Sequence, residues 1–515
     1  MEGPDAEHWR QAMEVELAAF RALETWDEGL VELPAGRRAL GVKWVLVVKR
    51  DVEGRIIKYK ARLVARGDQQ QDGVDFDETH SSTVRLPTVR LLLAILAHHP
   101  SFRYLQFDVS NAYLHGELDR AIFVRQPPGF TDPTRPSAVR RLRKALYGLR
   151  QGGREWQKVF RAALERIGFR RSDADHGLYV RRREGGLVTF VATHVDDGLM
   201  IGNDGDLEEV VAALEREFEG GVKVTTGGLF LGMRITRAED GTVTVDQGHY
   251  TRRVLDRFFP TPLSSVSTPV DPAAPVPIAG DESERTTVPY RELLGALVYA
   301  TYLKRVCRYL TGTTNLGLRY LPSNLAFSSS LVSGWTDADH TGDRDTRLFG
   351  VGADSLAAGA ISWNSRRQRS VAISSTEAEY VALSEAAREA VWLRQLLTDL
   401  GYTASSPTQI RGDNTGSLIL ASHPSSHSRT KHIGVHYHYT RERVEDEEIV
   451  LEWVPTGAMA ADLFTKGLGA AKHLLFRGMC GMVDARGEGG CDGNKGKPRN
   501  ASALTPGRKG GHIEI

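Results

Sequence analysis

Cysteine is scarce in this chain of 515 residues, which contains only Cys307, Cys480 and Cys491. Their separations fit neither a Cys/His metal-binding motif nor a disulfide framework, and this favours a reducing compartment. Long apolar runs are missing too. The run Leu91–Ala97 is far too short to cross a bilayer, and the first ten residues lack the basic-then-apolar pattern of a signal peptide. These absences predict an intracellular protein without a membrane segment.

A net charge of one sign is also lacking. The chain has 66 basic and 65 acidic residues, so its charge of +1 neither favours nor excludes nucleic acid as a partner. Its length predicts two or three domains, each with its own core. A local excess of arginine and lysine runs from Arg140 to Arg183. Two interpretations of this basic stripe stay open: it follows a phosphate backbone, or it is a solvated helix face.

The most informative pattern is a pair of adjacent acids, Asp196 and Asp197, inside the apolar segment Phe190–Gly202. Apolar runs on both sides predict a hairpin with the acids at its tip. Two like charges side by side repel each other, and a divalent cation would relieve that repulsion. Asp108 ends another predicted strand, Tyr104–Val109. Three acids from two neighbouring strands can hold two Mg²⁺ ions about 3.5–4 Å apart, as nucleotidyl transfer requires.

A second set of acids occurs in the C-terminal half, on a predicted strand, a long helix, a strand end and a last helix. They are Asp337, Glu377, Glu379, Asp413 and Asp462. Cleavage of a phosphodiester by two metal ions needs such a cluster. Ordinary roles stay open for some members. Glu377 and Glu379 each follow a Ser or Thr by three residues, as in a capping box, and Asp462 suits a helix cap.

Six segments in the first half of the chain together resemble the reverse transcriptase of copia-type retrotransposons, and they come in that family's order. They are YKARLVARG at Tyr59–Gly67, GVDFDET at Gly73–Thr79, DVSNAYLHG at Asp108–Gly116, QPPGF at Gln126–Phe130, KALYGLRQ at Lys144–Gln151 and VDD at Val195–Asp197. The resemblance implies an RNA-directed DNA polymerase, a nucleotidyltransferase shaped as a right hand with fingers and palm.

The resemblance implies that Asp108, Asp196 and Asp197 are ligands of two Mg²⁺ ions, for which Mn²⁺ could substitute. Tyr113 matches the aromatic residue that stacks under the incoming sugar and favours deoxynucleotides. A core aromatic is its alternative role. His194 stands where reverse transcriptases usually carry Tyr, and it is smaller and titrates near neutrality.

Nucleotide binding is implied for four further residues. Lys60, Arg62 and Arg66 lie in the fingers segment and could grip the triphosphate, although each could equally be a surface charge. Gln151 lies where the family's palm lines the nucleotide pocket, and a simple loop role is as plausible.

Four segments in the second half resemble the ribonuclease H domain that is fused to such polymerases. They are ISWNSRRQ at Ile361–Gln368, EAEY at Glu377–Tyr380, TKHI at Thr430–Ile433 and ADLFTK at Ala461–Lys466. The resemblance implies an endonuclease for the RNA of RNA–DNA hybrids, with Asp337, Glu379, Asp413 and Asp462 as ligands of two metal ions. Glu379 is preferred to Glu377 because Glu379–Leu383 fits that family's helix pattern.

The predicted fold is multidomain α+β and α/β: a right-hand polymerase, a connection segment and a ribonuclease H-like mixed-sheet domain. The boundaries are 1–258 for the polymerase, 259–330 for the connection, 331–468 for the ribonuclease H-like domain and 469–515 for a disordered Gly/Lys/Arg-rich tail. The expected partners are an RNA template, a DNA primer, RNA–DNA hybrid and deoxynucleotide triphosphates, with other Pol or Gag products of the element. The expected location is a cytoplasmic virus-like particle or the nucleus.

The chain departs from these families at several points. The helical stretch that normally joins the segments Tyr290–Ala300 and Lys304–Leu310 is absent, Arg347–Asp354 lacks the usual Ser/Thr-rich pattern, and Gly434 replaces an acid. These departures keep a second interpretation open, a catalytically decayed relic that only binds nucleic acid. A histidine-rich stretch favours nucleic-acid contact or plain surface over a zinc site; its members are His423, His427, His432, His436 and His438.

Overall fold

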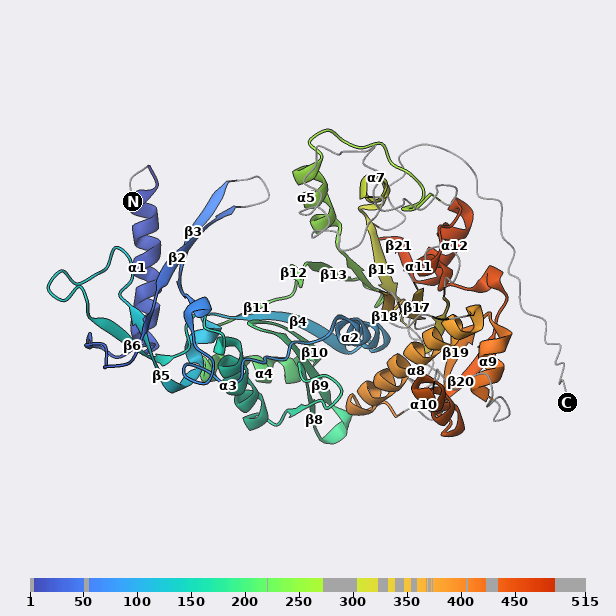
Figure 1. Ribbon diagram of the computed structural model, residues 1–515, viewed down its shortest axis with the longest axis horizontal. Helices are drawn as coiled ribbons and strands as arrows, with labels where there is room; N and C mark the ends of the chain where they lie inside the picture. The colour runs from blue at the N-terminus through green and yellow to red at the C-terminus, as the bar shows by residue number, and fades with distance from the viewer. Residues whose placement is uncertain are drawn as a thin grey trace.

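The protein forms a mixed α/β fold, as predicted, in a computed structural model (Figure 1). The structure describes residues 4–50, 55–219, 221–271, 303–322, 332–338, 347–352, 359–366, 368, 372, 374–403, 406–422 and 434–486. Their strands form sheets of two, three, six, five and five strands. No helix within these ranges is long and apolar enough to cross a membrane. The junction predicted to lack a helical stretch, Ala300–Lys304, lies mostly outside the described residues, as do three of the five histidines of the histidine-rich stretch.

The N-terminal lobe combines helix α1 with a long hairpin and a three-stranded sheet. Its elements are α1 (Ala6–Ala22), the hairpin β2 (Val42–Arg50) and β3 (Ile56–Ala65), and the sheet of β1 (Ala39–Leu40), β5 (Glu117–Arg125) and β6 (Val139–Lys144). One face of α1 is buried, with Leu17 and Phe20 in the core. Alternate residues of β3, among them Leu63, are buried in the same cluster. The hairpin (Figure 1) is held by the core at its base, and Val47, Ile56 and Ile57 nearer its other end are exposed.

A six-stranded sheet forms the centre of the molecule. Its order is β11-β4-β10-β9-β8-β7, from β4 (Phe102–Val109), β7 (Arg170–Arg171), β8 (Leu178–Arg182), β9 (Val188–His194), β10 (Asp197–Asn203) and β11 (Val222–Thr225). Successive residues of a strand point to opposite faces. Met200 therefore packs with helices α3 (Gly152–Arg166) and α4 (Asp204–Glu217), whereas Leu199 and Ile201 pack with α2 (Leu86–His98). Most residues of helix α2 are buried.

The adjoining five-stranded sheet corrects one predicted boundary. Its order is β12-β13-β14-β15-β21, from β12 (Leu229–Phe230), β13 (Met233–Arg237), β14 (Val243–Asp246), β15 (Leu316–Tyr320) and β21 (Met482–Asp484), beside α5 (Gly248–Phe258), α7 (Leu303–Thr313) and α12 (Ala470–Met479). Strands β13 and β14 pair as a hairpin whose turn contains Gly241. The prediction that the chain is disordered from residue 469 onward is wrong for residues 469–486. Phe476 on α12 is fully buried and β21 pairs with β15, so tertiary contacts order a segment whose composition alone indicates disorder.

The C-terminal sheet has the order β18-β17-β16-β19-β20. It consists of β16 (Ser333–Thr336), β17 (Arg347–Gly352), β18 (Ser362–Arg366), β19 (Thr408–Gly412) and β20 (Ile449–Trp453), with helices α8 (Ser375–Asp399), α9 (Thr415–Ser422), α10 (Gly434–Glu445) and α11 (Asp462–Thr465). Strands β16, β19 and β20 run parallel, and β17 and β18 are antiparallel to their neighbours. Arg347–Gly352, where the sequence departs from the expected pattern, still forms a central strand.

The C-terminal lobe packs directly on the central lobe, with α2 between them (Figure 1). One oxygen of Asp399, at the end of α8, accepts three hydrogen bonds from the loop after β7: from Ser172 Oγ at 2.6 Å and from the backbone N–H groups of Asp173 and Ala174 at 3.0 Å each. Trp392 Nε1 donates to the Ala174 carbonyl at 2.9 Å. One hydrophobic cluster continues across both lobes.

We expect Asp399→Ala to loosen this junction without unfolding either lobe. Hydrogen bonds to a charged acceptor contribute about 1.5–3 kcal/mol each, so the Asp173 and Ala174 amides should exchange with solvent at least ~10-fold faster. Hydrogen-exchange mass spectrometry of that loop measures this. Glu445→Ala, an exposed acid at the end of α10, is the control. Unchanged protection of the loop in Asp399→Ala would contradict the expectation.

Candidate active sites

The first site lies at the end of the central sheet, where β4 ends and β10 begins. Asp108 and Asp197 are directly paired across these antiparallel strands. His194 is opposite Asp197 on the other side, so Val195 and Asp196 form the two-residue turn of the β9–β10 hairpin. The hairpin with the acids at its tip is therefore as predicted.

The turn itself has an unusual backbone. Val195 has φ of 62°, a left-handed conformation that a β-branched residue rarely adopts. Two hydrogen bonds hold the turn: Trp156 Nε1 donates to the Val195 carbonyl at 2.7 Å, and the Val109 N–H donates to the Asp196 carbonyl at 3.0 Å. Such strain persists only where the surroundings determine the conformation. Here it sets the direction of the two acids.

The acids of this site repel one another. Partial desolvation at the sheet edge, together with the charges of Asp196 and Asp108, raises the pKa of Asp197, and nearby His194 opposes the shift. Among the described residues, these three acids do not bring their ligand oxygens within 4.8 Å of one another, a closeness found only in the second site. Carboxylate oxygens on two adjacent strands still suit Mg²⁺, which keeps several of its waters.

A cleft of about 650 Å³ connects these acids with the N-terminal hairpin. It is lined by Asp108 and Asp196 together with Lys60, Arg62, Tyr147 and residues of α1. Lys60 and Arg62 thus share a cleft with Asp108 and Asp196. Burial, and then the charges of Arg62 and Lys49, lower the pKa of Lys60. Tyr147, with Arg62 over its ring at 5.0 Å, was not predicted. Its position before Gly148 in the segment Lys144–Gln151 was the available signal.

The other three predicted nucleotide contacts do not line this cleft. Arg66 is exposed and forms an ion pair with Asp68 at 2.7 Å. Gln151 is buried; its oxygen accepts from Gln70 and its nitrogen donates to the Asp75 carbonyl, which is the loop role left open above.

Tyr113 lies next to the cleft rather than along its lining. Its ring packs against that of Tyr147, with 5.1 Å between centroids. A Cβ on Gly152 would come within 2.8 Å of the Tyr113 ring, so the glycine makes room for it. Burial, and then the charge of Asp196, raise the pKa of Tyr113.

Most of the basic stripe is paired within the protein. Arg143 pairs with Asp27, Arg154 with Glu78 and Arg183 with Glu209, while Arg181 is buried against Asp206. The members come from different strands and helices and face different acids. The stripe is therefore not a single solvated helix face, and several of its charges have acids of the protein itself as partners.

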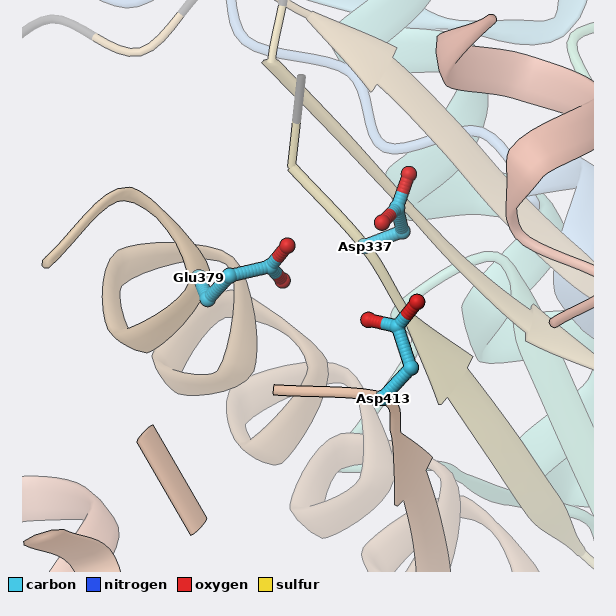
Figure 2. Close-up of side chains that lie close together, drawn as sticks. All are labelled: Asp337, Glu379 and Asp413. Atoms are coloured by element: carbon cyan, nitrogen blue, oxygen red, sulfur yellow. The ribbon is translucent and has the colours of Figure 1, made fainter. Parts of the chain in front are cut away.

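The second site gathers three acids at one edge of the C-terminal sheet (Figure 2). Asp337 directly follows β16 and Asp413 directly follows β19, and parallel neighbouring strands end at the same edge. Glu379, on the first turns of α8, points toward them (Figure 2). Ligand oxygens of all three lie within 4.8 Å of one another. Such a set of carboxylates fits a hard divalent cation.

Burial dominates the electrostatics of this site. Burial, and then the charges of Asp337 and Asp413, raise the pKa of Glu379 to about 9. Burial also raises the pKa of Asp337, although Lys466 opposes the shift. A carboxyl group that keeps its proton at neutral pH, as Glu379 does here, releases the proton when a cation binds.

Glu377 occupies the capping position left open above. Its N–H donates to Ser374 Oγ at 3.2 Å at the start of α8, and it does not belong to the group of three acids. Asp462 does not join that group either. Its carboxylate is fully buried between Lys466 and Lys472, two residues that were not predicted as part of the site.

Both sets of acids lie at sheet edges of a mixed α/β fold, and the group of Asp337, Glu379 and Asp413 could hold a metal ion. Comparison with known proteins shows what the chain is similar to. Residues 23–272 match the family model described as reverse transcriptase (RNA-dependent DNA polymerase). The retrovirus-related Pol polyprotein from transposon TNT 1-94 of Nicotiana tabacum is 32% identical over 93% of this chain and 38% of its own length. That from transposon RE2 of Arabidopsis thaliana is 33% identical over 93% of this chain and 34% of its own length.

The resemblance to retrotransposon Pol proteins is thereby confirmed, and the chain spans about a third of the length of these relatives. Among solved structures, that of the foamy viral protease–reverse transcriptase in complex with double-stranded DNA has a TM-score of 0.46 and 10% identity. It covers 87% of this chain and 70% of the viral one.

Proposed function

We propose that the protein is the RNA-directed DNA polymerase of a copia-type retrotransposon, and that its C-terminal domain cleaves the RNA of RNA–DNA hybrids. The observation that supports the polymerase most strongly is the direct pairing of Asp108 with Asp197, next to the turn that contains Asp196. Asp108 and Asp196 line a cleft that also holds the cationic side chains of Lys60 and Arg62. Residues 23–272 match the reverse transcriptase family. The order of the C-terminal sheet and the three acids at its edge support the nuclease.

In the polymerase site, Asp108, Asp196 and Asp197 would hold two Mg²⁺ ions, which supply Lewis-acid activation of the primer hydroxyl and neutralise the departing pyrophosphate. Lys60 and Arg62 take the charge of the incoming triphosphate from the hairpin side of the cleft. Trp156 keeps the Val195 turn in place, so that the acids stay aimed into the cleft. His194 contacts the primer strand beside Asp197.

Tyr113 selects deoxynucleotides by excluding a 2′-hydroxyl. We expect Tyr113→Ala to lower the preference for deoxynucleotides over ribonucleotides about 10- to 100-fold, the range of a small steric change in a pocket. Single-nucleotide incorporation with each substrate measures it. Tyr113→Phe keeps the ring and should keep the preference. Equal selectivity in Tyr113→Ala and the parent would assign Tyr113 to the core instead.

In the nuclease site, Asp337, Glu379 and Asp413 would hold a divalent ion that activates the attacking water and stabilises the charge on the phosphate. Thr456 donates to Asp413 Oδ2 at 2.8 Å and fixes the direction of that carboxylate.

Two assays of the full chain with Mg²⁺ test the function: extension of a DNA primer on an RNA template, and cleavage of the RNA in a labelled hybrid. The proposal expects both activities and their loss in EDTA. Salt-sensitive hybrid binding without incorporation or cleavage would instead establish the decayed relic.

A further inference from the structure

Asp462 is enclosed by cations of the protein itself. Its carboxylate has no exposed surface, and each oxygen has its own ammonium group: Lys466 Nζ at 2.6 Å from Oδ1 and Lys472 Nζ at 2.6 Å from Oδ2. Lys472 comes from α12, which packs against α11 and β21. Both oxygens of this carboxylate already accept a hydrogen bond from an ammonium group, so the carboxylate has little remaining capacity to bind a metal ion.

Lys466 also joins Asp462 to the group of three acids. Its Nζ lies 3.2 Å from Asp337 Oδ1, while Thr465 Oγ1 donates to the other oxygen of Asp337. The ammonium group of Lys466 therefore lies between the two carboxylates, where a second metal ion would otherwise bridge them.

The charges around the site balance with a single divalent ion. When all four carboxylates are ionised, the two lysines cancel half of their charge, and one divalent cation cancels the rest. Asp337, Glu379 and Asp413 are the three that face one another closely enough to share that ion. The Lys466 side chain is 34% exposed, so a phosphate group can reach its ammonium.

We propose that the nuclease site binds one divalent cation, on Asp337, Glu379 and Asp413, and that Lys466 supplies the second positive charge beside the scissile phosphate. Asp462 is then a positioning residue for Lys466 and not a metal ligand, which replaces the four-acid, two-metal assignment made from the sequence. The role of Lys466 beside a scissile phosphate rests on the proposed nuclease function. The number of bound ions can be measured whether or not the protein cleaves RNA.

The test is the number of Mn²⁺ ions bound by the full chain, measured by electron paramagnetic resonance. A background of Asp196→Asn with Asp197→Asn removes ligands of the polymerase site. We expect one Mn²⁺ in this background, one after adding Asp462→Asn, and at least 10-fold weaker binding after adding Glu379→Gln. Two ions in the background, with one of them lost on Asp462→Asn, would overturn the proposal.

Lys466→Met keeps the test decisive if Asp462→Asn fails to fold. Removal of the ammonium frees Asp462 Oδ1 and Asp337 Oδ1, so a second Mn²⁺ should bind between them, whereas Lys466→Arg should keep one. A single ion in Lys466→Met would contradict the role given to the lysine. The salt dependence of hybrid binding gives a second measure: the slope against log[salt] should fall by about one in Lys466→Met and stay unchanged in Lys466→Arg.

The outcomes separate this proposal from the proposed function. Hybrid cleavage by a protein that binds two ions would leave the nuclease standing and overturn the role of Lys466. One bound ion without cleavage would support the ion count and contradict the nuclease.

Discussion

Asp196→Asn should abolish primer extension on an RNA template and leave hybrid cleavage at the parent's level. Asparagine keeps the shape of the turn between β9 and β10 but removes one of the three negative charges that would hold the metal ions. Loss of about 4 kcal/mol or more of transition-state stabilisation corresponds to a decrease of ~10³-fold or more in the extension rate. Single-turnover extension and hybrid cleavage on the same preparation measure both activities.

The matched control for this change is Asp119→Asn, an exposed acid on β5 that does not line the cleft. It should extend primers like the parent. The cleavage assay serves as a folding control, because the second site lies in the other lobe. Extension by Asp196→Asn within 10-fold of the parent would contradict the assignment of the first site.

Glu379→Gln should abolish hybrid cleavage, leave primer extension intact and remove a characteristic pH dependence of metal binding. Because burial and the two neighbouring acids raise the pKa of Glu379 to about 9, the carboxyl is protonated at neutral pH in the metal-free protein. An ion must displace that proton. Its affinity should therefore rise with pH, by up to about 10-fold per unit between pH 7 and 8, and level off as the pH approaches 9.

Mn²⁺ titrations of the Asp196→Asn, Asp197→Asn background at a series of pH values measure this slope. Glu377→Gln, two residues earlier on the same helix, is the matched control, because Glu377 lies at the capping position. It should keep both cleavage and the pH slope. If Glu377→Gln lost them and Glu379→Gln kept them, the ligand assignment on α8 would be reversed.

The sequence was most informative where local pattern and chain direction decide the structure. The apolar runs around Asp196 and Asp197 predicted the β9–β10 hairpin, and Asp108 at the end of a predicted strand proved to be its direct neighbour. Alternation with a period of two residues and an acid at each strand end are visible without any tertiary contact. The same holds for Asp337 and Asp413, which directly follow two strands of one sheet.

Charge partners were not predictable in this way. The basic stripe proved to be a set of separate ion pairs, and Arg66 and Gln151 proved to have partners outside the cleft. Pairing between charges depends on elements far apart in the chain, about which periodicity and spacing carry no information. The order of α12 and β21, within the segment predicted to be disordered, comes likewise from packing against distant strands.

The sequence by itself determined the family, the two sets of acids and most of the strands that carry them, because these depend on local motifs. Only the tertiary structure decided which acids can share an ion. Asp462 belongs to the sequence pattern, but Lys466 and Lys472 enclose its carboxylate, while Asp337, Glu379 and Asp413 remain together. The physical reason is that a buried carboxylate takes the cation that the fold brings closest, and here the closest cations are two lysines of the chain itself.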